Sequence, residues 1–560
     1  MARGLIRCGL LYWVMMLAGI LVWTAPVLAE GRSPSWRITQ ESWSAADERG
    51  FGEFIERFGA ADCWTLDACL KSPANPYRHT DPRITFYADC ADLPYVLRAY
   101  YAWKNGLPFA YQTAMTPADG PGMDIRYSDG GNRVVGRKSV MATRIGIDAV
   151  AVLRELRSTI STGMYRHPAD ADDPVNFTDM YSVKLTREAV RPGTIVYDVN
   201  GHVAMVWRVE ENGRILTISS HPDHSLSRSF YGRQFLRTKP ELGAGFKNWR
   251  PIKLAGAKRA ADGTLTGGHI EALRNAELTD FSLEQYLGTD PKSWTHWLGA
   301  KFRHEGQELD YYDYVRTTMA VGELAYRPVE EVRSAVQSLC QDIEARTAAV
   351  ARAVALKIDR QPARSRLPEN IYGTYGSWET YSTPSRDARL KTAFKQMRDQ
   401  IETFIAMYQA GSTRLDYQGG DLAGDLLATF EEEAQSCRIS YRRTDGKPVT
   451  LDLEDVMHRL YALSFDPYQC VERRWGAAGA ELASCRDGPV KERWYRAEQP
   501  LRNQIDRTYD VFMGHTLTEL EAGPFGLDTG RGVEVAPDVD VTRYLRGLIA
   551  DRTASTSGTR

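Results

Sequence analysis

The sequence predicts an α+β domain followed by an all-α helical domain, and two observations support this division. In the first half, short runs rich in β-branched and aromatic residues are typical of strands. They cover residues 194–199, 202–210 and 214–219. After a basic, glycine-containing stretch at residues 253–268, apolar residues recur three and four positions apart, which is typical of amphipathic helices.

The first 29 residues have the layout of a secretory signal peptide. Arg3 and Arg7 precede an uncharged stretch that ends with Val27 and Ala29, the small residues expected before a cleavage site. An uncleaved membrane anchor is the alternative, because 22 uncharged residues are long enough to span a bilayer. In both cases the remainder is exported, so we expect a periplasmic or secreted protein.

The helical domain is predicted from its apolar stripes. Pro328 suits the first position of a helix, and the residues that follow it carry a stripe on one face. Further helices are predicted from Ser385, and over residues 422–434, 453–463 and 491–521. The predicted division is a signal peptide at 1–29, a first domain at 30–255, a linker with short helices at 256–327, the helical domain at 328–545 and a disordered tail at 546–560.

The charge balance argues against a nucleic-acid partner. The chain has 70 basic and 72 acidic residues, and cleavage of the signal peptide removes two basic residues and no acidic ones. The mature protein is therefore slightly acidic, without the excess of positive charge that nucleic-acid binding requires. Nothing in the sequence implies a cofactor.

Cysteine usage leaves one thiol over. Of eight cysteines, Cys8 leaves with the signal peptide, and seven remain. Pairing each with the nearest partner of its own region predicts three disulfides, between 63 and 69, 340 and 437, and 470 and 485. Cys90 is then free, and an unpaired thiol in an exported protein is either incidental or reactive.

A helix is predicted immediately after Cys90. Asp92 is its cap, Pro94 lies in its first turn, and Asn105 and Gly106 end it. The partial positive charge of a helix start and its free N–H groups favour a thiolate, which is the nucleophilic form, and they suit an oxyanion. We therefore expect Cys90 to have a stabilised thiolate.

A hairpin further along supplies candidate bases. Asn212 and Gly213 suit a two-residue type I′ turn. That turn would place His202 opposite Asp223 and Ala204 opposite His221, with an apolar face on one side and these polar side chains on the other. Cys90, His202 and a polar neighbour would then meet the needs of nucleophilic catalysis: a thiol, a base and a group that orients the base.

The residues 191–219, with Gly-His-Val at 201–203, resemble the second half of CHAP domains (cysteine- and histidine-dependent amidohydrolases/peptidases) and of NlpC-type cell-wall peptidases. Asp89 and Cys90 at a helix start resemble the first half of the same papain-like fold, so the resemblance spans residues 87–223. It implies a papain-like domain with an antiparallel sheet, Cys90 as nucleophile and His202 as base. It places the third residue at Ser220 or His221, whereas the hairpin register favours Asp223.

We therefore expect an exported cysteine hydrolase that cleaves an amide or peptide bond, with peptidoglycan or a peptide as substrate. Two alternatives remain. A transglutaminase-like acyl transferase has the same order of cysteine, histidine and aspartate, with Asp223 as third member and an amine as acceptor. An inactive scaffold would act through its helical domain, which would bind a partner in the cell envelope. The basic stretch at residues 228–253 either lines the cleft or forms a solvated surface.

Overall fold

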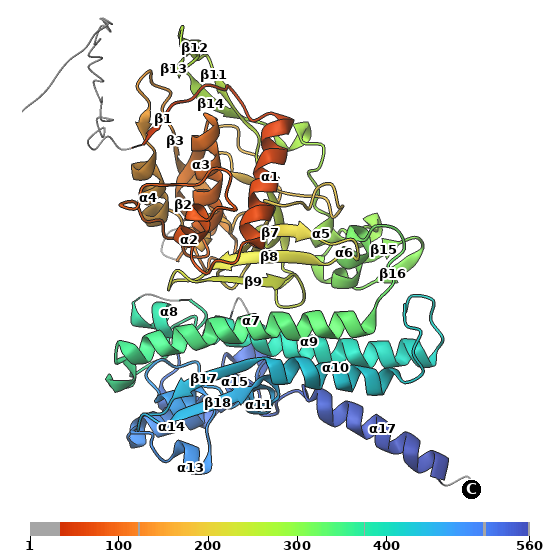
Figure 1. Ribbon diagram of the computed structural model, residues 1–560. Coiled ribbons are helices and arrows are strands. Elements are labelled where there is room, and N and C mark those ends of the chain that lie inside the picture. The colour runs from red at the N-terminus through yellow and green to blue at the C-terminus, as the bar shows by residue number, and fades with distance from the viewer. Residues whose placement is uncertain (1–33, 121–123, 374–375, 508–510, 558–560) are drawn as a thin grey trace, which may run out of the picture.

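The computed structural model describes residues 34–120, 124–373, 376–507 and 511–557, and it has two layers (Figure 1). A mixed α and β layer contains a large antiparallel sheet, and a mostly helical layer lies beneath it. The predicted signal peptide lies outside the described residues. Within the ranges just given, no helix combines the length and the apolar character that a membrane crossing needs.

The main sheet has six strands in the order β5-β10-β6-β7-β8-β9, with all neighbours antiparallel. Its strands are β5 Met180–Ser182, β6 Ile195–Asp198, β7 His202–Val209, β8 Ile215–Ser220, β9 Leu226–Phe230 and β10 Gly245–Trp249. The three strand-like runs predicted from the sequence are β6, β7 and β8. Both faces of the central strands are buried, which explains why their sequences are nearly continuous apolar runs.

One face of the sheet packs against the helices of the N-terminal segment. These are α1 Ala45–Ala60, α2 Leu66–Lys71, α3 Leu93–Asn105 and α4 Ala149–Thr159. Trp207 fills the space beside Gly59 of α1, where any side chain would meet the indole at 2.3 Å. As predicted, α3 ends at Gly106, whose φ of 64° suits glycine. A single core thus joins α1 and α3 to β7.

The predicted register of the β7–β8 hairpin is wrong. Three residues, 211–213, form the loop, with Gly213 at a φ of 77°, in place of the two-residue turn. Val209 consequently pairs with Ile215, and a bulge beside Trp207 then shifts the register again, so that Met205 pairs with Ile218. Continued along the strands, this register places His202 opposite His221.

The expectation of a linker at 256–327 also differs from the structure, because this segment folds onto the first half. It contributes β14 His269–Ala272, which pairs with β11 Ile252–Ala255 just before the segment. Two further pairs lie within it: β12 Lys258–Arg259 with β13 Leu265–Thr266, and β15 Phe302–His304 with β16 Gln307–Leu309. Its helix α6 Tyr311–Met319 brings aromatic side chains to the second face of the main sheet. The short helix α5 Glu284–Leu287 is joined to β10 by hydrogen bonds between Gln285 and the Phe246 backbone.

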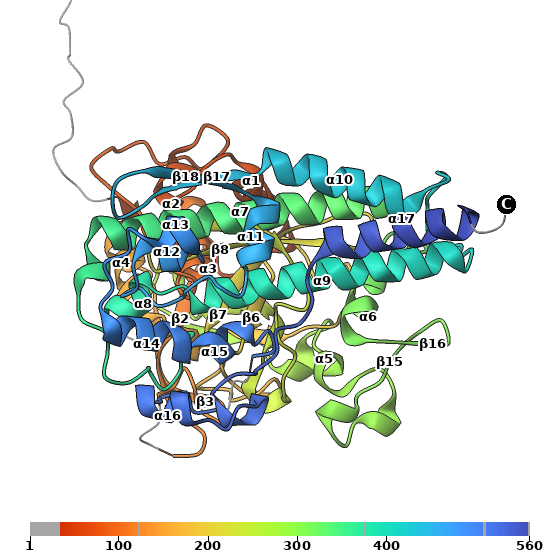
Figure 2. The ribbon, with the colours of Figure 1, turned by 90° about the horizontal axis from the view of Figure 1, so that it is seen from below.

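The helical layer is built on α7 Pro328–Ala355, α9 Pro384–Gln409, α10 Leu422–Ser436 and α17 Val541–Ser557, which lie side by side in Figure 2. The predicted helix starts at 328, 385 and 422 agree with this structure to within one residue. The layer is not all-α, because β17 Arg438–Arg442 and β18 Pro448–Asp452 form a hairpin. The predicted disordered tail is also wrong for its described part, since α17 continues to Ser557.

The remaining elements are short and connect or cover the larger ones. They are β1 Ser35–Trp36, β4 Ile147–Asp148, the hairpin of β2 Ala110–Pro117 and β3 Asn132–Ser139, α8 Ser377–Tyr381, α11 Leu453–Arg459, α12 Val471–Arg474, α13 Gly479–Leu482, α14 Pro489–Ala497, α15 Gln499–Asn503 and α16 Leu517–Ala522. In place of the long helix predicted at 491–521, the described residues form three short ones, because Pro500 starts α15 and Thr516 caps the start of α16.

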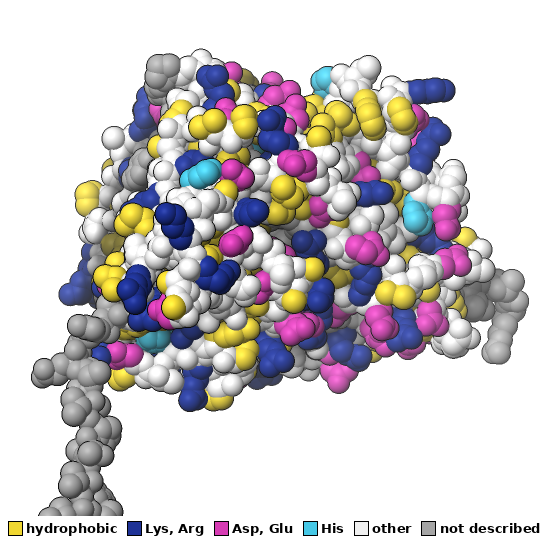
Figure 3. Space-filling model, turned by 90° about the horizontal axis from the view of Figure 1, so that it is seen from above, with side chains coloured by type: hydrophobic (Ala, Val, Ile, Leu, Met, Phe, Trp, Pro, Cys, Tyr) yellow, Lys and Arg dark blue, Asp and Glu magenta, His cyan; other side chains and the backbone are white. Residues whose placement is uncertain are grey.

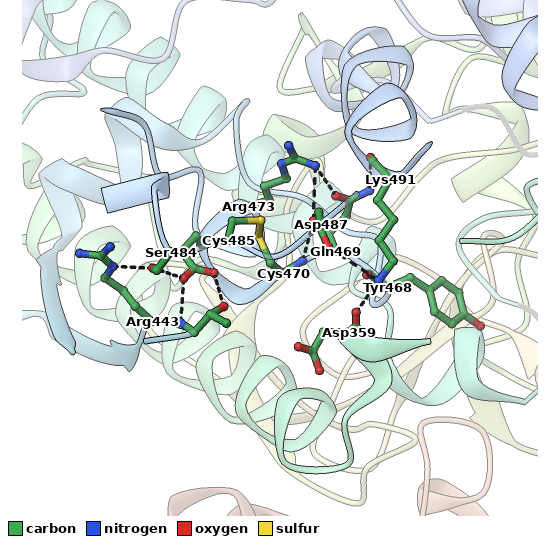
Figure 4. The surroundings of a disulfide bond; sticks show 12 residues. Asp359, Arg443, Tyr468, Gln469, Cys470, Arg473, Ser484, Cys485, Asp487 and Lys491 are labelled. Carbon is green, nitrogen blue, oxygen red and sulfur yellow. Dashed lines mark hydrogen bonds and ion pairs between the residues drawn. A yellow bond between two sulfur atoms is a disulfide. The ribbon is translucent and has the colours of Figure 1, made fainter. Parts of the chain in front are cut away.

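The three predicted disulfides are confirmed: Cys63–Cys69, Cys340–Cys437 and Cys470–Cys485. The second joins α7 to the end of α10. The third sits in a polar network, in which Arg473 and Lys491 approach Asp487 (Figure 4). Three disulfides favour an oxidising compartment, in agreement with export.

The two layers are joined through polar contacts and through the edge of the main sheet. Strand β9 lies along α7, so a helix covers a sheet edge that would otherwise be open. Glu331 of α7 accepts from Arg214 at 2.7 Å and from Arg316 at 2.6 Å. Arg507 approaches Asp198 at 2.8 Å. On the face of the upper layer that points away from the helical layer, basic and acidic side chains are interspersed, as on a solvated surface (Figure 3).

Candidate functional site

A cavity of about 140 Å³ lies between the two layers and is lined from both. The upper layer contributes Asp89, Cys90, His202 and His221, and the helical layer contributes Arg386 and Arg389 from the first turns of α9. Three of the four predicted site residues are therefore in one cavity. Asp223, the fourth, is not part of its lining.

Cys90 is the free thiol of the described residues, as predicted. It lies three positions before the start of α3, in a turn packed against the loop between β6 and β7. Its Sγ is 3.8 Å from the carbonyl oxygen of Gly201, and the backbone N–H of Val203 lies close enough to favour the thiolate, though less than burial opposes it. The sulfur thus contacts the residues on both sides of His202.

The expected stabilisation of the Cys90 thiolate is wrong. Burial and the neighbouring Asp89 carboxylate raise the pKa of the Cys90 thiol above its usual value. Asp89 accepts hydrogen bonds from the backbone N–H groups of Ala91, at 2.8 Å, and Asp92, at 3.2 Å. These are the N–H groups that would have stabilised a thiolate, so the resting form of Cys90 is the neutral thiol.

His202 is the first residue of β7 and is buried. On one side its strand position pairs with Asp198 of β6. Burial, followed by the positive charge of Arg389 and by His221, lowers the pKa of His202 well below its usual value. The imidazole is therefore neutral at physiological pH and can accept a proton.

His221 follows β8 and lies beside His202, as the observed register requires. The two rings are stacked with centroids 5.8 Å apart and planes 16° apart. His221 Nε2 is 2.8 Å from the hydroxyl oxygen of Ser227. Burial and the charges of Arg386 and Arg389 lower the pKa of His221 well below its usual value. His221 consequently contacts His202 through its ring face.

Asp223 has partners other than His202. Asp223 lies near the tip of a tight turn, in which the backbone N–H of His221 donates to the carbonyl oxygen of Ser225. The Asp223 carboxylate accepts from the Ser225 hydroxyl at 2.6 Å and from Arg386 at 3.2 Å. Burial opposes this charge, but Arg386 and the hydrogen bonds outweigh it and lower the pKa of Asp223. Asp223 therefore anchors an arginine of the helical layer and does not orient His202.

The cations of the cavity were not predicted from the sequence. Arg386 and Arg389 lie almost 300 positions after Cys90 on a helix whose sequence resembles an ordinary amphipathic one. Arg389 donates to the Ser385 hydroxyl at 2.7 Å. Burial, and then the charge of Arg507, lower the pKa of Arg389 to about 10, so it remains charged at neutral pH.

The basic stretch at 228–253 does not line this cavity. Three of its four arginines donate to backbone carbonyl oxygens, and the fourth, Arg233, forms an exposed ion pair with Asp310. Arg228 bonds Gly59 and Ala61, Arg237 bonds Gln285, and Arg250 bonds Thr178. The interpretation of the stretch as cleft lining is therefore wrong for this cavity, and a solvated surface describes only part of it.

Among the described residues, Cys470, Glu472 and Cys485 are close enough together to hold a metal ion. The two cysteines are joined in a disulfide, so they have no thiolates to offer as ligands. This cluster is thus a structural feature of the helical layer.

Comparison of the chain with models of protein families, with curated proteins and with solved structures gives no match.

Proposed function

We propose that this protein is an exported cysteine hydrolase of papain-like architecture, in which Cys90 is the nucleophile and His202 the general base. The supporting observation is the convergence of the free thiol with two neutral imidazoles in one cavity. The arrangement of α3 behind Cys90, packed on a sheet that carries His202, agrees with such a fold.

The charge states favour attack assisted by a general base over a preformed ion pair. His202 accepts the thiol proton as Sγ attacks the carbonyl carbon of an amide. The C–N bond then breaks, and His202 returns the proton to the leaving nitrogen. Water, deprotonated by His202, attacks the thioester carbon; the C–S bond breaks, the acid is released, and the proton restores the thiol.

The backbone N–H of Cys90 suits the oxyanion that forms during these steps. Among the hydrogen bonds of the described residues, this N–H has no acceptor, whereas those of Ala91 and Asp92 are occupied by Asp89. A free N–H beside the attacking sulfur is where the oxyanion of a tetrahedral intermediate develops.

His221 is the better candidate for positioning the base. It is held by Ser227 and stacks on the His202 ring, which restricts the orientations open to His202. Asp223 serves a different purpose, because its carboxylate is engaged by Arg386. The transglutaminase-like alternative needs Asp223 as its third member and therefore has weaker support.

Export and the amidase architecture together favour a peptide of the cell wall as substrate, and this is tested by product analysis. Purified peptidoglycan is incubated with the full mature chain, and released fragments are identified by mass spectrometry. We expect new amine and carboxyl ends with the unmodified protein. Cys90→Ala and His202→Ala should release none, while the control His458→Ala, an exposed histidine of the helical layer, should match the unmodified protein.

A parallel reaction with added glycine ethyl ester separates hydrolysis from acyl transfer. Hydrolysis leaves a free acid, whereas a transferase would leave the glycine amide. Release of fragments by Cys90→Ala would refute the role of Cys90 as nucleophile. The absence of any change in peptidoglycan and peptide substrates would refute the hydrolase proposal and favour the inactive scaffold.

A further inference from the structure

The cavity next to Cys90 is lined by an arginine side chain, Arg389, that has few hydrogen-bonding partners. Of the arginines that line it, Arg126 pairs with Glu379 at 3.1 Å and Arg386 pairs with Asp223 at 3.2 Å. Arg389 differs, because in the part of the chain that the structure describes it forms no ion pair and its side chain donates to Ser385. Its positive charge is therefore not neutralised by direct contact.

A guanidinium carries five N–H donors in a fixed fork, and a partly buried one is normally paired with an anion. Asp342 and Asp198 attract Arg389 from a distance, but neither is in ion-pair contact with it in the described structure. The open side of Arg389 faces the cavity. An arginine in this situation is a binding group for a planar anion such as a carboxylate.

The surroundings reinforce this preference. Pro384 and Ser385, in the first turn of the 26-residue helix α9, also line the cavity. The start of a long helix adds a partial positive charge to the charges of Arg386 and Arg389. The anions of the lining are Glu379, which is paired with Arg126, and Asp89, which is bonded to backbone N–H groups.

We propose that Arg389, with Arg386 and the first turn of α9 beside it, binds a free carboxylate of the substrate in the cavity that contains Cys90. The inference rests on the proposed hydrolase function, since the substrate is the molecule whose amide Cys90 attacks. It restricts that substrate to peptides with a free carboxylate close to the scissile bond. It also gives the helical layer a role, which is to supply the anion-binding half of the site.

Binding is measured in the full chain with Cys90→Ala, so that no turnover is needed. The probes are N-acetyl-alanyl-alanine and its C-terminal amide, which differ in charge and hardly in size, and binding is followed by calorimetry. A charge-assisted hydrogen bond predicts roughly a 10- to 100-fold preference for the acid. Arg389→Met in the same background should abolish that preference. Lys395→Met should keep it, because Lys395 lies on the same helix but pairs with Asp399 outside the cavity.

Equal affinity for the acid and the amide, or a preference that survives Arg389→Met, would overturn the proposal. Binding of inorganic phosphate that requires Arg389, without binding of the acid, would also overturn it.

If Arg389→Met does not fold, the unmodified protein provides the test. The acid should slow the alkylation of Cys90 by iodoacetamide, and equal protection by acid and amide would refute the proposal. Because these readouts need no catalysis, loss of the hydrolase proposal and loss of the carboxylate site are distinguishable.

Discussion

Glu331 joins the helical layer to the sheet layer, and its replacement by glutamine should lower the free energy of unfolding. The carboxylate is 2.7 Å from Arg214, on the loop side of β8, and 2.6 Å from Arg316 of α6. The Glu331 side chain is 6% exposed. Glu331→Gln keeps the shape but removes the charge. It takes from Arg316 its carboxylate partner and leaves Arg214 with the more distant Glu210, at 3.7 Å.

The size of the effect follows from this burial. Removing one member of a buried, hydrogen-bonded charge group costs about 3–5 kcal/mol, because the remaining charges stay desolvated. Glu330 is the matched control: it is adjacent in sequence, but its side chain is 61% exposed. Since exposed ion pairs contribute little, Glu330→Gln should leave the free energy of unfolding essentially unchanged.

The assay is urea unfolding of both variants and the unmodified protein, repeated between pH 3 and pH 7. Burial alone would raise the pKa of Glu331, but Arg316 and Arg214 outweigh it and hold the pKa below its usual value. The stabilisation is therefore fully present above the pKa of an unfolded glutamate, about 4.3, and is lost as the pH falls through the lower folded pKa. The deficit of Glu331→Gln should shrink below about pH 4. A loss no larger than that of Glu330→Gln at pH 7 would show that the Glu331 carboxylate does not stabilise the contact between the layers.

Three further predictions concern the thiol, the core and the disulfides. Iodoacetamide should alkylate Cys90 more slowly at pH 7 than it alkylates a model thiol, with a rate that rises at alkaline pH, because burial and an adjacent carboxylate raise its pKa; fast labelling at pH 7 would contradict this. Trp207→Ala should lower the free energy of unfolding by about 3–5 kcal/mol, while Trp294→Ala should lower it by less than about 1 kcal/mol, because Trp294 is 53% exposed. Equal losses would show that α1 does not pack on the sheet as described. Replacing both cysteines of the Cys340–Cys437 disulfide with serine should lower the free energy of unfolding by about 4.7 kcal/mol, against about 2.2 kcal/mol for Cys63–Cys69, because the sequence separations are 97 and 6. The reverse order in urea unfolding would contradict this prediction.

Local patterns in the sequence were sufficient for much of the fold. The stripe after Pro328 gives α7, and Gly106 ends α3, because a helix start and a helix stop each depend on residues close in sequence. The disulfides follow from pairing neighbours within a region. A bulge beside Trp207 has no such local signal, so the hairpin register could not be predicted from the turn alone.

The candidate site divides in the same way. Cys90 and His202 could be identified because an odd cysteine and a Gly-His-Val strand are visible in the sequence. The protonation state of Cys90 could not, since it depends on burial and on where the Asp89 carboxylate lies. Arg389 reaches the cavity only through the packing of α9 on the sheet layer, and a contact between positions so far apart requires the tertiary structure.

The proposed hydrolase requires that an amide substrate acylates Cys90, and the mass of the protein during turnover reveals whether it does. The full mature chain is mixed with a peptidoglycan-derived peptide that carries a free carboxylate, quenched in acid within the first turnover, and weighed intact. We expect an added mass equal to the acyl part, located on the Cys90 peptide, removed by neutral hydroxylamine and absent from Cys90→Ala. Cleavage of the peptide without any adduct on Cys90, or cleavage that persists in Cys90→Ala, would contradict it.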